Sequence, residues 1–253
     1  MIASKRFESP DKWADMEAWH LLLWIKILAK DIERTDAFAL ATMLFYKIKR
    51  SLYFQLQPAQ HVQLKNTLAF LAESNGLNRW LIQTIKPLPW LRFIGPQNRL
   101  STSTIQEFRL AEKYYLLYQA SQNENYIDLL IATLYRPKGL SEEQRDYRIQ
   151  LTELLVDKNG QKMRRLSKTV RAAIVFNYEG CRNFIFAKYP TIFKPSAGGK
   201  KSTTIPDLEG LIKTVAGGKF GTFKETNDTG LYLFLDHLAD EIEADEQLKR
   251  TKK

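Results

Sequence analysis

Apolar residues recur at intervals of three and four along most of this chain, and this periodicity limits the fold more than any other feature of the sequence. It is clearest in residues 101–139, which divide into two amphipathic segments separated by a polar run. Phe108, Ala111 and Tyr115 share one helical face in the first segment, and Pro137 ends the second. The pattern predicts two α-helices that bury one face each.

Polar residues stand where the ends of these two helices need them. Ser103 or Thr104 can cap the first helix, and Glu107 follows Thr104 at the spacing of a capping box. Arg136 is expected either to donate hydrogen bonds to the last carbonyls of the second helix or to pair with a carboxylate such as Glu107. Glu107 and Glu112 are expected to be solvated or ion-paired, because neither belongs to a catalytic pair.

The same period before and after this stretch predicts an all-α fold, a bundle-like array of about nine to ten helices. The expected helices cover residues 13–30, 35–52, 59–74, 80–85, 104–121, 126–135, 142–156, 167–189, 206–216 and 229–238. Residues 90–100 are expected to form a connector. The sequence DKNG at 157–160 is a turn signal that fits the tip of a short hairpin near Asn159-Gly160 or the start of the next helix.

Changes in composition predict four parts of the chain. Residues 1–89 form an N-terminal helical region, and residues 90–194 form a central helical core. Residues 195–205, which contain the sequence PSAGGKK, form a flexible linker. Residues 206–253 form a C-terminal helical hairpin with a charged tail that is expected to fray from Ala239 onward.

The net charge is +10 over 253 residues, but the charges are distributed unevenly. Residues 201–253 carry a net charge of −2, and the positive charge lies in the rest of the chain. A cluster of basic side chains neutralises phosphates or attracts an acidic protein. The best candidate for such a contact is the basic segment Lys158, Lys162, Arg164, Arg165, Lys168 and Arg171.

Motifs for chemistry are missing from the sequence. His20, His61 and His237 are far apart in the chain, so we expect no metal site. The one cysteine, Cys181, is expected to be a small buried residue, and His20 a core or boundary residue. We therefore expect no catalytic residue and no cofactor, and the protein is predicted not to be an enzyme. No run is apolar enough to span a membrane, and no signal peptide is recognised, so a cytoplasmic location is expected.

Three motifs resemble those of a known group of proteins. They are TIQEF at 104–108, LLIATLYRP at 129–137 and FNYEGCR at 176–182. Together they resemble proteins from the tail-gene clusters of bacteriophages and phage-like particles, particularly those of Bacteroidetes hosts. The similarity covers about residues 90–240.

The resemblance implies a tail assembly chaperone in the host cytoplasm, a helical protein that performs no chemistry. It also implies that the partners are other tail proteins, including the tape measure or the tail tube. Two alternatives stay open. The chain is a structural component of the virion tail, or it binds nucleic acid through the basic segment.

Overall fold

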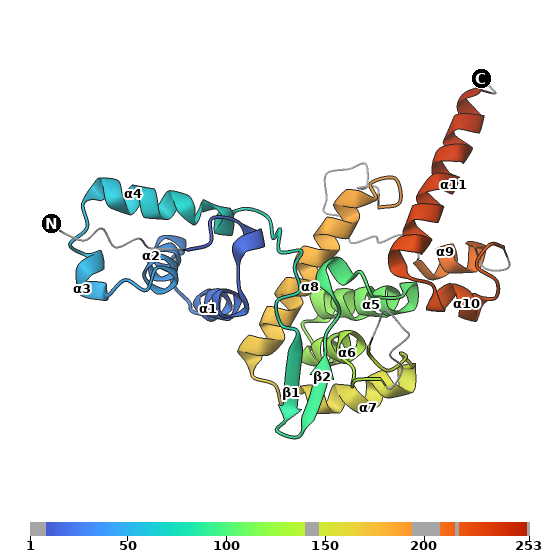
Figure 1. Ribbon diagram of the computed structural model, residues 1–253, viewed down its shortest axis with the longest axis horizontal. Coiled ribbons are helices and arrows are strands. Elements are labelled where there is room, and N and C mark those ends of the chain that lie inside the picture. The colour runs from blue at the N-terminus through green and yellow to red at the C-terminus, as the bar shows by residue number, and fades with distance from the viewer. Residues whose placement is uncertain (1–8, 140–146, 194–207, 216–217, 252–253) are drawn as a thin grey trace.

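The computed structural model describes residues 9–139, 147–193, 208–215 and 218–251 (Figure 1). Within these ranges the chain forms eleven α-helices and one two-stranded sheet, which confirms the predicted all-α class. The helices are α1 (Ala18–Leu28), α2 (Arg34–Phe45), α3 (Arg50–Tyr53), α4 (Pro58–Thr67), α5 (Ile105–Ser121), α6 (Glu124–Leu134), α7 (Glu153–Met163), α8 (Lys168–Lys188), α9 (Leu208–Val215), α10 (Phe223–Asp228) and α11 (Leu231–Thr251).

Two hydrophobic cores organise the chain. The first lies mainly in residues 9–77, called here the N-terminal lobe, where Met16, Leu21 and Phe45 are almost fully buried. The second gathers residues from Trp80 onward, including the C-terminal helices. Figure 1 shows α1 to α4 set to one side of α5, α6 and α7, with α8 running between the two groups.

Helix α8 contacts both cores. Its residue Ala173 belongs to the first core, whereas Ile174 and Tyr178 belong to the second. The end of the N-terminal lobe crosses α8 at Gly180, where a Cβ atom would collide with the carbonyl oxygen of Leu77. A residue without a side chain is needed there because backbone and helix approach closely.

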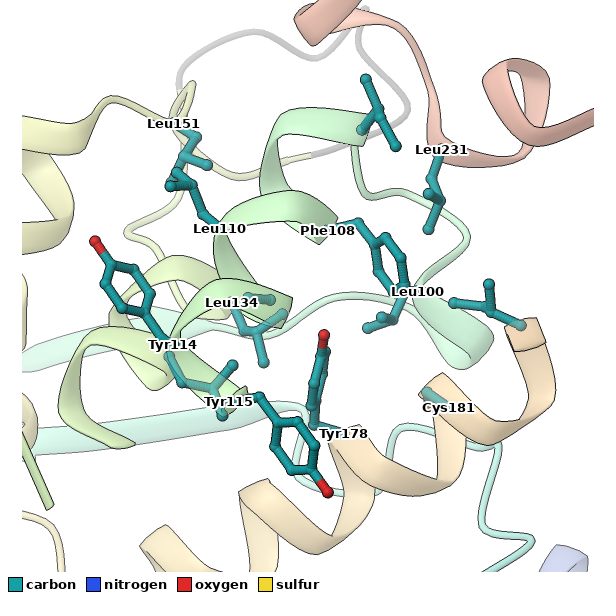
Figure 2. Close-up of a cluster of buried hydrophobic side chains, with 14 of the residues drawn as sticks. Leu100, Phe108, Leu110, Tyr114, Tyr115, Leu134, Leu151, Tyr178, Cys181 and Leu231 are labelled. Carbon is teal, nitrogen blue, oxygen red and sulfur yellow. The ribbon is translucent and has the colours of Figure 1, made fainter. Parts of the chain in front are cut away.

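The second core forms around the two helices that the sequence defines most clearly. Thr104 caps α5 by accepting a hydrogen bond from the amide of Glu107 at 3.2 Å. Figure 2 shows Phe108, Leu134 and Tyr178 entering the core from α5, α6 and α8. Tyr115 lies beside Tyr178, with 5.7 Å between the ring centroids.

A β-hairpin occupies a stretch in which a short helix and a connector were expected. Strand β1 (Thr84–Leu88) pairs antiparallel with β2 (Leu91–Ile94), and the turn carries Pro89 and Trp90. The amide of Ile94 donates to the carbonyl of Arg136 at 2.8 Å, so the hairpin is fixed by a distant residue. Local periodicity cannot detect such long-range pairing.

The hairpin considered near Asn159-Gly160 does not form, because both residues lie inside α7. They are buried, and a Cβ atom on Gly160 would come within 3.0 Å of Leu129 Cδ2 in α6. Gly160 therefore serves close packing of two helices and not a turn. The expected helix at 142–156 begins only at Glu153, and residues 140–146 lie outside the described part.

The C-terminal helices pack against the start of α5. The amide of Leu231 donates to the carbonyl of Ser103 at 2.9 Å, and Phe234 and Leu235 are fully buried. Helix α10 was not expected from the sequence, and α11 stays helical through the acidic tail that was expected to fray. Figure 1 shows α11 projecting beyond the rest of the molecule. The predicted linker, residues 195–205, lies outside the described residues.

Candidate functional site

The structure divides the basic segment into engaged and unengaged side chains. Arg171 is buried on α8 and meets two carboxylates of α6. Its Nη1 lies 2.6 Å from Glu124 Oε2, and its Nη2 lies 2.9 Å from Asp128 Oδ1. Burial raises the pKa of Asp128, and Arg171 and Arg164 oppose that change. Arg171 therefore holds α8 against α6.

Two more basic residues of this segment have partners close by. Lys162 Nζ donates to Asn159 Oδ1 at 2.8 Å, and Arg164 Nη2 donates to Asn125 Oδ1 at 2.7 Å. Arg164 also lies 3.3 Å from Asp128 through its Nε atom. The first contact lies within α7, and the contacts of Arg164 tie the end of α7 to α6.

Three basic residues remain exposed, and within the described ranges they form no ion pair. They are Lys158 on α7, Arg165 in the turn, and Lys168 in the first turn of α8. These three of the six predicted residues are exposed without a partner among the described residues, whereas Arg164 is exposed but paired with Asp128.

Two buried ion-pair clusters hold α5 in place. Glu107 is fully buried and accepts from Arg148 at 2.7 Å and from Arg136 at 3.3 Å. Of the two alternatives expected for Arg136, the structure shows the pairing with Glu107. One helical turn and a half further on, Glu112 is also buried and accepts from Arg182 Nε at 2.8 Å.

Two other side chains named in the sequence analysis, Cys181 and His20, are part of the packing. Cys181 is fully buried, as expected, and burial raises the pKa of its thiol to about 12. The thiol is therefore protonated at neutral pH, which is the unreactive form. His20 is buried, and its Nδ1 accepts from the amide of Glu17 at 3.1 Å. Among the described residues, no three His, Cys, Asp or Glu side chains are grouped closely enough to hold a metal ion.

A groove of about 620 Å³ lies in the N-terminal lobe and is lined by both apolar and polar side chains. We call it the α3–α4 groove. It is lined by Ser9, Asp11, Tyr46, Ile48, Leu52, Leu56, Gln60, Gln63, Leu64 and Thr67. Figure 1 shows α3 at the end of the lobe that faces away from α5, α6 and α7, and α4 running from there along the lobe.

Apolar side chains make this groove suitable for a protein partner. Within the groove, Leu52 is 43% exposed, and Leu56 and Leu64 are half-buried. Tyr46 and Ile48 are buried and form a firm base. Large apolar side chains that gather in one exposed area, in contrast to scattered single ones, mark contact sites.

Basic residues stand next to two of the lining residues in the sequence. Lys47 and Lys49 flank Ile48, Lys65 follows Leu64, and all three lysines are exposed. The one acid in the lining is Asp11. Basic residues near leucines of a groove favour a partner that carries acids beside its apolar face.

Sequence reasoning missed this site because its residues do not form a motif. Leu52, Leu56 and Leu64 look like ordinary core positions of two predicted helices. They become a groove only because α4 leaves space beside α3, which is a tertiary feature. The one available signal was the unusually polar composition of α4, whose sequence is PAQHVQLKNT and which buries none of its residues.

None of the helices in the described part of the chain combines the length and hydropathy that a membrane crossing requires. Comparison with models of known protein families, with curated proteins and with solved structures finds no match to this chain.

Proposed function

We propose that this protein is a non-catalytic assembly factor that holds a segment of another phage tail protein in the α3–α4 groove. The observation that carries the proposal is the groove itself, which is lined by the exposed Leu52 and the half-buried Leu56 and Leu64. The resemblance of residues 90–240 to tail-cluster proteins supplies the class of partner. The site of action is then the host cytoplasm, where tails are assembled.

The occupant we expect is one amphipathic helix of the tape-measure or tail-tube protein. Helix α4 has ten residues and is therefore about 15 Å long, which matches about two to three turns of a partner helix. Partner helices bind such grooves through apolar residues spaced three and four apart. The exposed Lys49, Arg50 and Lys65 favour acidic residues beside that apolar face.

Co-purification tests the proposal directly. The full chain is co-expressed with the tape-measure protein and, separately, with the tail-tube protein from the same phage. We expect one of the two to co-purify, and deletion of the gene that encodes this chain to block tail formation. Failure to bind either protein, together with normal tails after deletion, would falsify the proposal.

A structural virion component is the closest alternative, because such a protein also needs a surface for other tail proteins. Mass spectrometry of purified particles distinguishes the two. A chaperone is absent from mature particles, whereas a tail component is present in fixed ratio to the tail-tube protein. The nucleic-acid alternative rests on Lys158, Arg165 and Lys168, which are exposed.

A further inference from the structure

A second cavity, of about 640 Å³, lies where the segment that follows the N-terminal lobe meets the turn before α5. We call it the two-arginine pocket. Its lining residues are Asn78, Arg79, Gln83, Gln97, Asn98, Arg99 and Ser101. All seven side chains are polar, two are guanidinium groups, and no carboxylate is among them. The volume falls within the range of small-molecule sites.

The two walls of this pocket are tied together by hydrogen bonds. The amide of Trp80 donates to Asn98 Oδ1 at 2.9 Å, and the amide of Arg99 donates to the carbonyl of Asn78 at 2.9 Å. Tyr232 in α11 donates its hydroxyl proton to the carbonyl of Arg99 at 2.7 Å. The backbone around both arginines is therefore fixed before any ligand arrives.

The turn has an unusual backbone conformation. Arg99 and Leu100 have φ values of 58° and 57°, which lie in the left-handed region. Each such residue costs about 1–2 kcal/mol when it is not glycine. The buried side chain of Leu100 helps to hold the turn in place. Strain of this kind concentrates at ligand-binding sites, where it presents a side chain in a fixed direction.

Both guanidinium groups retain free hydrogen-bond donors. Arg79 donates to the carbonyl of Ala14 through Nη1 at 2.6 Å, and the structure gives its other nitrogens no further hydrogen bond within the described residues. The guanidinium carbon of Arg99 lies 4.6 Å from the ring centroid of Phe184, a contact that leaves its N–H edge free. The positive charge of Arg79 opposes the rise in the pKa of Asp15, so these two side chains interact electrostatically. Asp15 itself is ion-paired with Lys12 at 3.8 Å.

We infer that the two-arginine pocket binds a ligand through a phosphate group. A carboxylate offers two oxygens in one plane and is satisfied by a single guanidinium. A terminal phosphate offers three oxygens in different directions, and so takes Arg79, Arg99 and neighbouring amide donors together. Two guanidinium groups from separate segments, without a carboxylate between them, fit the phosphate.

Isothermal titration of the full chain tests this site. The probes are inorganic pyrophosphate, ATP and a single-stranded oligothymidine, with citrate as a carboxylate control. We expect at least one phosphate probe to bind, and Arg79→Gln and Arg99→Gln each to weaken that binding by about tenfold or more, since a charged hydrogen bond contributes about 1.5–3 kcal/mol. Arg92→Gln removes the same charge from an exposed side chain of β2 that does not line the pocket, and should leave the affinity unchanged.

Two further results decide the source of the phosphate and guard against misfolding. Binding of pyrophosphate and ATP without the oligonucleotide identifies a small phosphorylated ligand, whereas binding of the oligonucleotide through Arg79 and Arg99 identifies a nucleic-acid strand. Arg99→Lys keeps the charge but not the planar guanidinium group. It should lower the affinity for the phosphate probe less than Arg99→Gln does and leave the thermal midpoint of unfolding unchanged. The inference is overturned if no phosphate probe binds, if both Gln variants bind normally, or if citrate binds as tightly as pyrophosphate.

Discussion

Replacement of Arg182 by methionine tests how the second core tolerates the charge buried within it. Glu112 on α5 is 2% exposed and receives hydrogen bonds from Arg182 Nε at 2.8 and 3.0 Å and from the Tyr178 hydroxyl at 2.6 Å. Burial raises the pKa of Glu112, and the charge of Arg182 is the main opposing influence. Arg182→Met removes that charge, while the methionine side chain still fills the space beside Tyr115 and Phe186.

Breaking a buried ion pair from one side costs about 3–5 kcal/mol, because the remaining charge loses its compensation. The side chain of Arg182 is 17% exposed, so water reaches part of it and the lower end of this energy range applies. We therefore expect Arg182→Met to lower the free energy of unfolding by about 3 kcal/mol at pH 7. For a chain of this size that corresponds to a fall in Tm of about 6–12 °C.

The loss should depend on pH in a defined direction. Without Arg182 the pKa of Glu112 rises further above its ordinary value of 4.5, so the folded protein binds a proton more tightly than the unfolded chain does. The variant is then closest to wild type below pH 4.5 and loses stability as pH rises through the folded-state pKa. Each unit of pKa change contributes about 1.4 kcal/mol to this difference.

Urea denaturation followed by circular dichroism, at several pH values, measures these quantities. Glu112→Gln added to Arg182→Met removes the uncompensated carboxylate and should restore most of the loss at pH 7. The reasoning is refuted if the double variant is no more stable than Arg182→Met, or if the deficit of Arg182→Met grows as the pH is lowered.

Three further predictions concern other parts of the chain. Gly180→Ala should destabilise the protein by about 1–3 kcal/mol in urea titration, because the new methyl meets the carbonyl of Leu77, whereas Gly230→Ala, with open space around it, should cost far less. Ser167→Ala removes the N-cap of α8 and should cost about 1 kcal/mol in the same assay; an unchanged midpoint contradicts the cap. Under the nucleic-acid alternative, Arg165→Glu should reduce the salt slope of DNA affinity by about one unit, and an unchanged slope argues against that alternative.

The parts of the fold that the sequence predicted are those that local forces determine. Helix α5 begins directly after its cap Thr104 and ends before the polar run at 122–125, because capping and periodicity act over a few residues. The Arg136–Glu107 pair could be anticipated for a related reason. Each residue sits at an end of one of two adjacent helices, and a charge at such a place needs a partner when it is buried.

The errors occurred where distant contacts decide the structure. Gly160 reads as a turn residue in isolation, yet it lies in a helix because Leu129 packs against it. Residues 84–94 form a hairpin because Ile94 pairs with Arg136, more than forty positions later. Both candidate sites belong to this second class, since the α3–α4 groove and the two-arginine pocket each bring together segments that have no motif of their own.

The central claim is that the α3–α4 groove holds a segment of a tail protein. The most direct test is the affinity of the full chain for the tape-measure or tail-tube protein that co-purifies with it, compared between Leu52→Asp and Leu154→Asp. Leu154 is a matched control, because it is also an exposed leucine, 79% accessible, but lies on α7 outside the groove. We predict that Leu52→Asp weakens binding by about tenfold or more while Leu154→Asp leaves it unchanged. Equal affinity of the two variants, with both folded, would contradict the account.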